Sequence, residues 1–270
     1  MNLLINDKLK RAVILLFAKN PQKFYRQSVV RIGKFLSDTD IQTTDIINGD
    51  LFIQLEKTLE ILKTKYLLSN ISYECIHRRD LLEYPYEALR EAVINALIHR
   101  DYSGASQIQI RVYSDKLIIM NEGRLPPEVP LEKLKTNHLS VPRNTMLAEI
   151  FYYAGFIESW GRGTVKIVEN CLEQGLPEPD YSEENGVMTV TFYKNKWNEK
   201  NLKKLKLNKR QIKAVMYVKE NGKMTNYQHQ KEFGVSKATA TRDLSDLVRK
   251  SVLIKRGETG KGTFYTIKGS

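Results

Sequence analysis

The stretch PYEALREAVINALIHRDY, residues 85–102, predicts the central helix of the chain, from Tyr86 to about Arg100. A proline suits the first turn of a helix, where the N–H that it lacks would have had no partner. Most positions of this helix are apolar, so we expect it to be largely buried. One polar stripe runs along it, formed by side chains that recur every four residues: Glu87, Glu91, Asn95 and His99.

The polar stripe allows two interpretations of Glu91 and Asn95. A carboxylate and an amide on a buried helix are costly unless they have partners or a task, which favours a binding site. The same two side chains, four residues apart, can instead satisfy each other along a narrow wet edge. The helix alone leaves both interpretations open.

The elements around this helix predict a two-layer α/β sandwich, within the α+β class. Before it, we expect strands at residues 13–17 and 28–35 and a helix at residues 50–68. After it, we expect a hairpin of residues 107–112 and 116–120, helices at 145–153 and 164–174, and a strand at 188–193. The proline-rich loop that follows the hairpin is too long for a simple connector, which is typical of lids and binding loops.

Two glycine motifs lie at the ends of these elements. The segment Asn-Glu-Gly at residues 121–123 places a polar side chain and a glycine where a strand ends. The segment Gly-Arg-Gly at residues 161–163 stands just before a helix, where free backbone N–H groups and the helix dipole can meet a phosphate. Each motif is weak alone, but their order after the Glu-x-x-x-Asn helix is much more specific.

That order resembles the ATP-binding fold shared by gyrase, heat-shock chaperones, mismatch-repair MutL proteins and histidine kinases. Roughly residues 10–194 are most similar to one branch, the RecG-like transcriptional regulators, in which this ATPase-like domain follows a Schlafen-type Alba-like domain. The segments that carry this resemblance are NALIHRDY (95–102), IMNEGRLP (119–126), SVPRN (140–144), GFIESWGRGT (155–164) and GLPEP (175–179).

The resemblance implies a site for ATP and Mg²⁺. Glu91 matches the carboxylate that activates water, and Asn95 matches the amide that holds Mg²⁺ against the phosphates. Asn121 replaces the aspartate that usually accepts a hydrogen bond from adenine, which puts adenine selectivity in question. Arg124 and Leu125 stand where the wider pattern has a further glycine, a change that the branch shares, so the resemblance does not imply hydrolysis. Residues 124–160 would form the lid. The nucleotide-binding set is completed by three glycines that line the adenine and phosphate sides: Gly123, Gly161 and Gly163.

The charge of the chain is concentrated at one end. Residues 195–270 contain 19 basic and 6 acidic side chains, a net charge of +13, whereas residues 1–194 contain 24 and 25. Such an asymmetry favours a nucleic-acid-binding module attached to a neutral body. A lysine-rich solvated surface is the alternative.

The basic end predicts a winged helix-turn-helix. We expect helices at residues 208–221, 225–233 and 237–250, followed by strands at 252–256 and 263–267. The segment FGVSKATATRDLSDLVRKSVL, residues 233–253, resembles bacterial winged-helix regulators. The side chains predicted to contact DNA are Lys237, Thr239, Thr241 and Arg242 on the third helix and Lys255, Arg256 and Lys261 on the wing. A winged helix used for protein contacts is the alternative.

The predicted domains are therefore a remnant of an Alba-like domain with a connecting helix (1–80), an ATPase-like domain (81–195), a linker (196–206) and a winged helix-turn-helix (207–270). The two cysteines and the lack of a membrane-spanning apolar run indicate the cytoplasm. His138 and His229 have no partners at ligand spacing and are expected on the surface.

These features predict a bacterial DNA-binding regulator that senses a nucleotide or another ligand in its ATPase-like domain, through a homodimer in one version of this hypothesis. The alternatives are a working Mg²⁺-dependent ATPase that remodels a DNA complex, and a scaffold with a degenerate pocket. The sequence contains no P-loop motif, so we expect no helicase motor despite the RecG-like resemblance.

Overall fold

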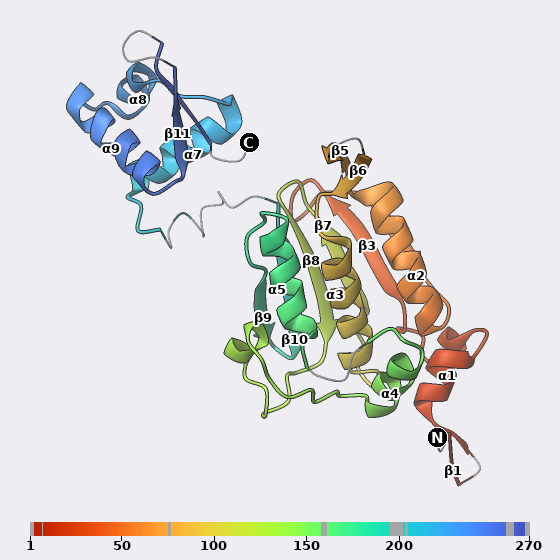
Figure 1. Cartoon of the computed structure of the whole chain (residues 1–270). Coiled ribbons are helices and arrows are strands. Elements are labelled where there is room, and N and C mark those ends of the chain that lie inside the picture. The colour runs from red at the N-terminus through yellow and green to blue at the C-terminus, as the bar shows by residue number, and fades with distance from the viewer. Residues whose placement is uncertain are drawn as a thin grey trace. The chain divides into compact units, whose positions relative to one another are not determined.

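The computed structural model describes residues 3–6, 8–74, 77–157, 161–194, 202, 205–257 and 262–267, with the backbone alone for Ile5 and residues 69–81. The chain divides into two compact units, Met1–Lys194 and Asn195–Ser270 (Figure 1). Trp160, Lys261 and most of the predicted linker lie outside the described residues. Each unit is considered by itself.

The first unit is built on a six-stranded sheet with the strand order β4-β3-β7-β8-β10-β9. Neighbouring strands are antiparallel except β3 and β7, which run parallel with Val30 opposite Ile108. The strand bounds are β3 Val30–Phe35, β4 Ile41–Ile47, β7 Ile108–Val112, β8 Lys116–Glu122, β9 Asp180–Glu184 and β10 Val187–Tyr193. This mixed sheet with its helices confirms the predicted α+β class.

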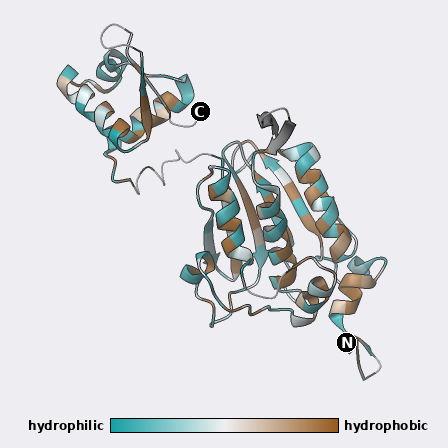
Figure 2. Cartoon of the chain, viewed as in Figure 1, coloured by the Kyte–Doolittle hydropathy of each residue, from teal (hydrophilic) through white to brown (hydrophobic). Residues whose placement is uncertain are grey.

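The predicted central helix is α3, Tyr86–His99, which packs between α2 (Leu51–Ile61) and α5 (Gly163–Glu173) over one face of the sheet (Figure 1). Eight of its side chains are buried against inward-facing strand residues such as Ile32, Ile110 and Ile119. Figure 2 shows hydrophobic colour along these strands and on α3. Two further helices, α1 (Arg11–Phe17) and α4 (Thr145–Tyr153), contact each other beside this layer.

Smaller elements complete the first unit. Short turns of helix are η1 (Pro21–Lys23), η2 (Leu62–Tyr66), which continues α2, and η3 (Leu131–Lys135) within the proline-rich loop. Two separate hairpins are formed by β1 (Leu4–Ile5) with β2 (Lys8–Leu9) and by β5 (Ser69–Glu74) with β6 (His77–Leu82).

One predicted element is wrong: residues 13–17 form part of helix α1 and not a strand. Leu15 and Leu16 are both buried, although neighbours on a strand would face opposite sides of a sheet. A short apolar run carries too little periodicity to separate a buried helix from a buried strand.

Residues 1–80 and 81–194 share one sheet and one hydrophobic core. Strand β3 from the first segment pairs with β7 from the second, and the core extends from Leu15 to Phe192. The two predicted domains thus form one compact unit. The origin of residues 1–80 in an Alba-like domain stays a prediction.

Among its described residues, the second unit contains the helices α7 (Lys209–Asn221), α8 (Asn226–Phe233) and α9 (Lys237–Arg249), followed by a small hairpin of β11 (Leu253–Arg256) and β12 (Phe264–Ile267). Capping explains where its helices begin, because Asn208 and Thr225 form capping boxes with Gln211 and Gln228, and Ser236 caps α9. Met224 pairs with Tyr265 and extends the wing by one bridge. This arrangement confirms the predicted winged helix-turn-helix.

Candidate nucleotide pocket and DNA interface

The first unit contains a pocket between α3, the end of β8, the start of α5 and the loop over them. Its apolar lining comes from Ile119, Leu125, Val129, Leu134, Met188 and Val190. Six predicted site residues line this pocket together, although they come from three distant segments: Glu91, Asn95, Asn121, Gly123, Gly161 and Gly163. The fold therefore brings the predicted set together, while the role of each residue stays a prediction.

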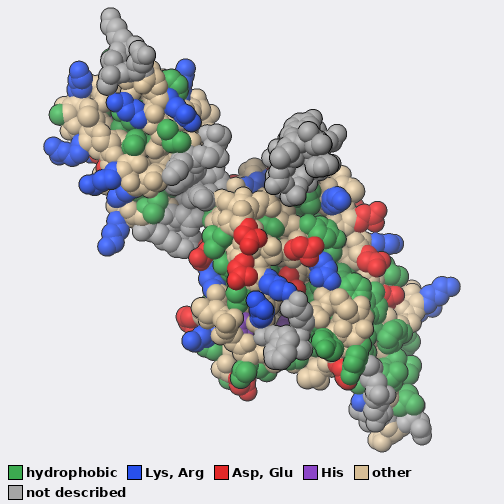
Figure 3. Space-filling model, in the orientation of Figure 1, with side chains coloured by type: hydrophobic (Ala, Val, Ile, Leu, Met, Phe, Trp, Pro, Cys, Tyr) green, Lys and Arg blue, Asp and Glu red, His purple; other side chains and the backbone are tan. Residues whose placement is uncertain are grey.

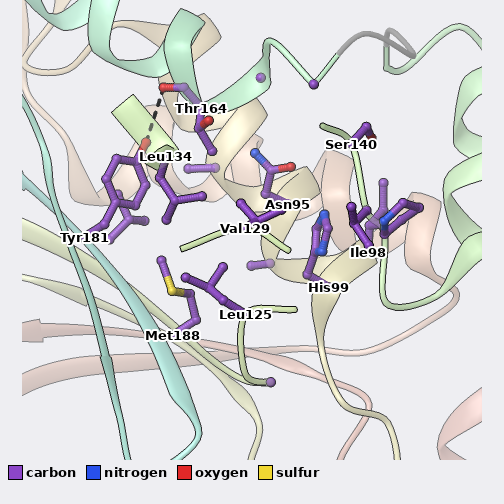
Figure 4. A pocket seen from close by; sticks show the side chains of 18 of the residues that line it. Asn95, Ile98, His99, Leu125, Val129, Leu134, Ser140, Thr164, Tyr181 and Met188 are labelled. Atoms are coloured by element: carbon purple, nitrogen blue, oxygen red, sulfur yellow. Dashed lines mark hydrogen bonds between the residues drawn. The ribbon is translucent and has the colours of Figure 1, made fainter. Parts of the chain in front are cut away.

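Glu91 and Asn95 follow one another along the pocket side of α3. Asn95 Nδ2 donates a hydrogen bond to Glu91 Oε1 at 3.4 Å, so the two side chains pair and also line the pocket. The side-chain pair is therefore present, and the interpretation of Glu91 and Asn95 as binding residues stays a prediction. Because this bond uses the amide nitrogen, the amide oxygen of Asn95 is left for another partner (Figure 4).

Gly163 is the first residue of α5, and Glu91 fills the space beside it. A Cβ at this position would overlap Glu91 Oε1. The negative carboxylate next to a helix N-terminus is electrostatically favourable. The sequence predicts that Gly163 allows a phosphate to approach the backbone. In the structure, the absence of a side chain at Gly163 makes room for the Glu91 carboxylate.

Gly161 makes room for the loop over the pocket. Its φ is +65°, and a Cβ there would overlap the carbonyl oxygen of His138 and lie 3.1 Å from Ser140 N. Both the left-handed backbone and the close approach therefore require glycine at this position.

Asn121 and Gly123 close the other end of the pocket, where β8 ends. The Asn121 side chain is buried and its residue lies opposite Met188 of β10. Gly123 has φ +146°, and a Cβ there would lie 2.6 Å from the carbonyl oxygen of His99. The strand end and the C-terminal end of α3 can meet this closely only at a glycine.

His99 is a pocket residue that the predicted site did not include. It follows Asn95 by one helical turn and projects into the pocket beside it (Figure 4). Burial, and then the nearby Arg143 and His138, lower the pKa of His99 to about 4, so the imidazole is neutral at pH 7. Its place on the polar stripe was the signal that could have identified it.

The loop over the pocket is shorter than the predicted lid at 124–160. Helix α4 lies within that range, and its Leu147, Ile150 and Phe151 belong to the hydrophobic core. The segment that covers the pocket is residues 124–143, here named the pocket loop. It contributes Val129 and Leu134 to the lining, together with His138, which is half-buried.

In the second unit, α9 presents the predicted DNA-contacting side chains on one side. Lys237, Thr241 and Arg242 are exposed, and Thr239 is half-buried, while Ala240, Leu244 and Leu247 face the core. Thr241 accepts a hydrogen bond from Asn226 Nδ2 at 2.9 Å, which ties its hydroxyl to α8. Lys255 and Arg256 are exposed on β11. Among the charged side chains on the face of this unit drawn in Figure 3, Lys and Arg predominate.

A partly exposed salt bridge joins α7 to α9, and a buried histidine of α8 lies beside it. Arg210 on α7 pairs through its guanidinium with Asp243 on α9, and His229 Nε2 on α8 lies 3.6 Å from the same carboxylate. His229 is fully buried, which corrects the expectation that it lies on the surface. Burial lowers the pKa of His229, although Asp243 acts in the opposite direction. The sequence around His229 gives no indication that its side chain is buried against Asp243.

Two further features of the described residues concern metal-binding clusters and membrane-spanning helices. Among the described residues, no cluster of three His, Cys, Asp or Glu side chains could hold a metal ion. No helix in the described part of the chain has the length and apolar character to span a bilayer.

Each of the two units contains a region that matches a known protein family. Residues 105–192 match the family described as "Putative ATP-dependent DNA helicase recG C-terminal", a range that begins after α3, and residues 210–260 match the DeoR-like helix-turn-helix domain. No curated protein matches the chain.

Among solved structures, the fold is similar to the crystal structure of the DIP2311 protein from Corynebacterium diphtheriae. The TM-score is 0.60 at 18% identity, and the similarity covers 96% of this chain and 54% of the other. This chain therefore spans about half the length of that protein, and the likeness concerns the fold alone.

Proposed function

The chain carries an ATPase-like domain of the RecG C-terminal type and a DeoR-like helix-turn-helix domain, and we propose that it is a DNA-binding transcriptional regulator whose pocket binds a nucleotide. The observation that carries the nucleotide site is the convergence of the six predicted residues on one pocket. The net charge of +13 on residues 195–270 supports duplex DNA as the partner of the second unit.

In this proposal the base lies at the Asn121 end of the pocket. Ile119, Met188 and Val190 supply an apolar surface for an aromatic ring, and the Asn121 amide supplies a polar contact at its edge. An amide offers both a donor and an acceptor, unlike the aspartate of the wider fold. Adenine therefore fits, without the strict selectivity that a carboxylate would impose.

The phosphates then extend toward Asn95 and the start of α5. Mg²⁺ takes oxygen ligands, mostly water and phosphate, so a single amide oxygen from Asn95 suits a metal carried in by the nucleotide. A bound Mg²⁺ would neutralise charge on the phosphates. Glu91 stands next to this position and keeps its carboxylate directed at the N-terminus of α5.

The second unit would read DNA through α9. Helices of this type enter the major groove, where Arg242 and Lys237 can reach base edges and phosphates. Lys255 and Arg256 would contact the backbone from the wing. Pairing two copies would match two half-sites of an operator, and we place the protein in the cytoplasm as a homodimer.

The decisive experiment is calorimetric titration of ATP and a non-hydrolysable analogue, with and without Mg²⁺. Asn95→Ala should abolish Mg²⁺-dependent binding, whereas Glu91→Gln should keep it. Lys133→Ala, a change at an exposed side chain outside the pocket lining, is the matched control. Equal affinity in wild type and Asn95→Ala would exclude this nucleotide site and leave the scaffold hypothesis.

One observation favours a second candidate function, an active ATPase. The Glu91 carboxylate lines the pocket one helical turn from Asn95, the proposed Mg²⁺ ligand, and a general base must lie within hydrogen-bonding reach of the water that it activates. Phosphate release by wild type but not by Glu91→Gln would establish hydrolysis. Binding without release in both proteins would favour the sensor.

A further inference from the structure

The pocket loop, residues 124–143, is fastened at its end by Asn144. Asn144 Nδ2 donates to the carbonyl oxygens of Ile98 at 2.7 Å and Arg100 at 2.8 Å. Carbonyls at the C-terminal end of a helix lack partners within the helix, so this amide satisfies two groups that end α3. The same helix carries Glu91, Asn95 and His99 toward the pocket.

The Asn144 side chain serves α3 and not its own helix. Asn144 is the N-cap residue of α4, a position where asparagine ordinarily accepts a hydrogen bond from the first turn. No such side-chain cap bond forms here. The amide is turned instead to the end of α3, which indicates that attachment of the loop, more than the start of α4, requires an asparagine.

Arg143 fastens the beginning of the loop to its end. Its Nη2 donates to the carbonyl oxygen of Arg124 at 2.9 Å, and its Nη1 lies 3.6 Å from Asp101 Oδ2. Asp101 in turn donates its backbone N–H to Glu122 O at 2.7 Å, at the end of β8. The Arg143 guanidinium thus joins the two ends of the pocket loop to each other and to Asp101, which follows α3.

This arrangement also explains the narrow space at Gly123. A Cβ there would lie 3.4 Å from Arg143 Nε and 2.6 Å from His99 O. The end of β8 is therefore held between α3 and the arginine.

We propose that Arg143 and Asn144 are positioning residues of the pocket, which join the two ends of the pocket loop to the C-terminal end of α3. We name Arg143, Asn144, Asp101 and the Arg124 carbonyl the loop clasp. Through the clasp, the loop lining formed by Val129, Leu134 and His138 is held over the α3 side chains. As a statement about ligand affinity, the inference rests on the proposed nucleotide function.

Asn144→Ser tests the clasp without removing a helix cap. Serine is as good an N-cap as asparagine, but it has no amide donors to reach the two carbonyls. We expect nucleotide affinity to fall about ten-fold in Asn144→Ser and in Arg143→Ala, with α4 intact. Arg143→Lys should recover part of the loss, because it restores the charge opposite Asp101 but not the guanidinium fork. Arg31→Ala, at an exposed arginine outside the pocket lining, is the control for lost charge.

Hydrogen exchange supplies a readout that needs no ligand. Amide exchange should accelerate several-fold in residues 124–142 of both variants, while α2 and the second unit keep wild-type rates. Wild-type protein that binds no nucleotide would refute the proposed function, and the exchange rates would still decide on the clasp. Unchanged affinity and unchanged exchange in both Asn144→Ser and Arg143→Ala would overturn the proposal.

Discussion

The pocket of the first unit and the DNA-contacting surface of the second are built in opposite ways. On α9, the residues predicted to reach bases lie within one stretch, 237–242, and a single helix arranges them. The pocket draws on α3, the end of β8, the pocket loop and the start of α5, so long-range packing arranges its residues. The shape of the α9 surface should therefore survive the loss of one side chain. The shape of the pocket depends on the contacts that hold its separate segments together.

Removal of residues 205–270 should have the largest effect, because it deletes the DNA-contacting surface and leaves the pocket in place. The truncated chain should lose at least about a thousand-fold in duplex DNA affinity, since the excess positive charge lies in the missing segment. Nucleotide binding by the first unit, which has its own core, should survive. Fluorescence anisotropy with labelled duplex measures the first quantity and calorimetry the second. DNA binding as tight as that of the full chain would show that the winged helix is not the DNA-binding element.

One glycine in each unit separates two reasons for requiring glycine, a neighbouring segment that leaves no room for a Cβ and a left-handed backbone. Gly161→Ala should reduce the free energy of unfolding by about 3 kcal/mol, because it adds an overlap with the pocket loop to a left-handed backbone. Gly234→Ala, which ends α8 at φ +61° with open space around it, should cost only about 1 kcal/mol. Urea denaturation of the two variants provides the measurement. Equal losses would mean that the loop moves freely away from Gly161.

The same difference explains what the sequence could predict. Helices α7, α8 and α9 begin at Asn208, Thr225 and Ser236, whose capping is local and legible in the sequence. The edge strands β4 and β9, IQTTDII and DYSEE, were not predicted, because edge strands are exposed and lack a clear alternation of apolar residues. The apolar run at residues 13–17 carries too little periodicity to separate a helix from a strand.

The candidate site divides along the same line. The spacing of Glu91 and Asn95 on α3 left a binding site and a simple side-chain pair both open, and the two glycine motifs, with the resemblance that their order carries, favoured a site. Neither the contact of Gly161 with the loop backbone nor the bonds of Asn144 to α3 could be read from spacing, since each joins segments more than 20 residues apart. Long-range contacts of this kind leave no periodic trace in the sequence.

Within the second unit, a smaller effect should separate base reading from phosphate contact. Arg242→Ala should cost about 1–3 kcal/mol on a preferred sequence and little on random DNA, because only base contacts carry sequence information. Lys255→Ala should weaken both by a similar factor and reduce the dependence of affinity on salt. Competition binding over a range of salt concentrations distinguishes the two. If both variants lost affinity uniformly, α9 would be a phosphate-contacting helix only.

The smallest effect concerns the neutral imidazole of His99. Its pKa in the folded chain is about 4, below the usual value of about 6.5, because the charged form is disfavoured by burial and by nearby cations. The unfolded chain therefore takes up a proton first as the pH falls. The contribution of His99 to stability is fully present above pH 6.5 and is lost as the pH decreases from 6.5 toward 4.

His99→Phe should flatten that part of the stability profile by on the order of 1 kcal/mol, after allowance for the solvent that reaches an open pocket. The measurement is urea denaturation of residues 1–194 at pH 7, 6 and 5, for wild type and variant. Restricting the test to this segment keeps out His229, whose pKa is also lowered by burial but which lies next to Asp243 in the other unit. If the free energy of unfolding of the variant changed with pH as steeply as that of wild type between pH 7 and 5, His99 would be open to water and would titrate normally.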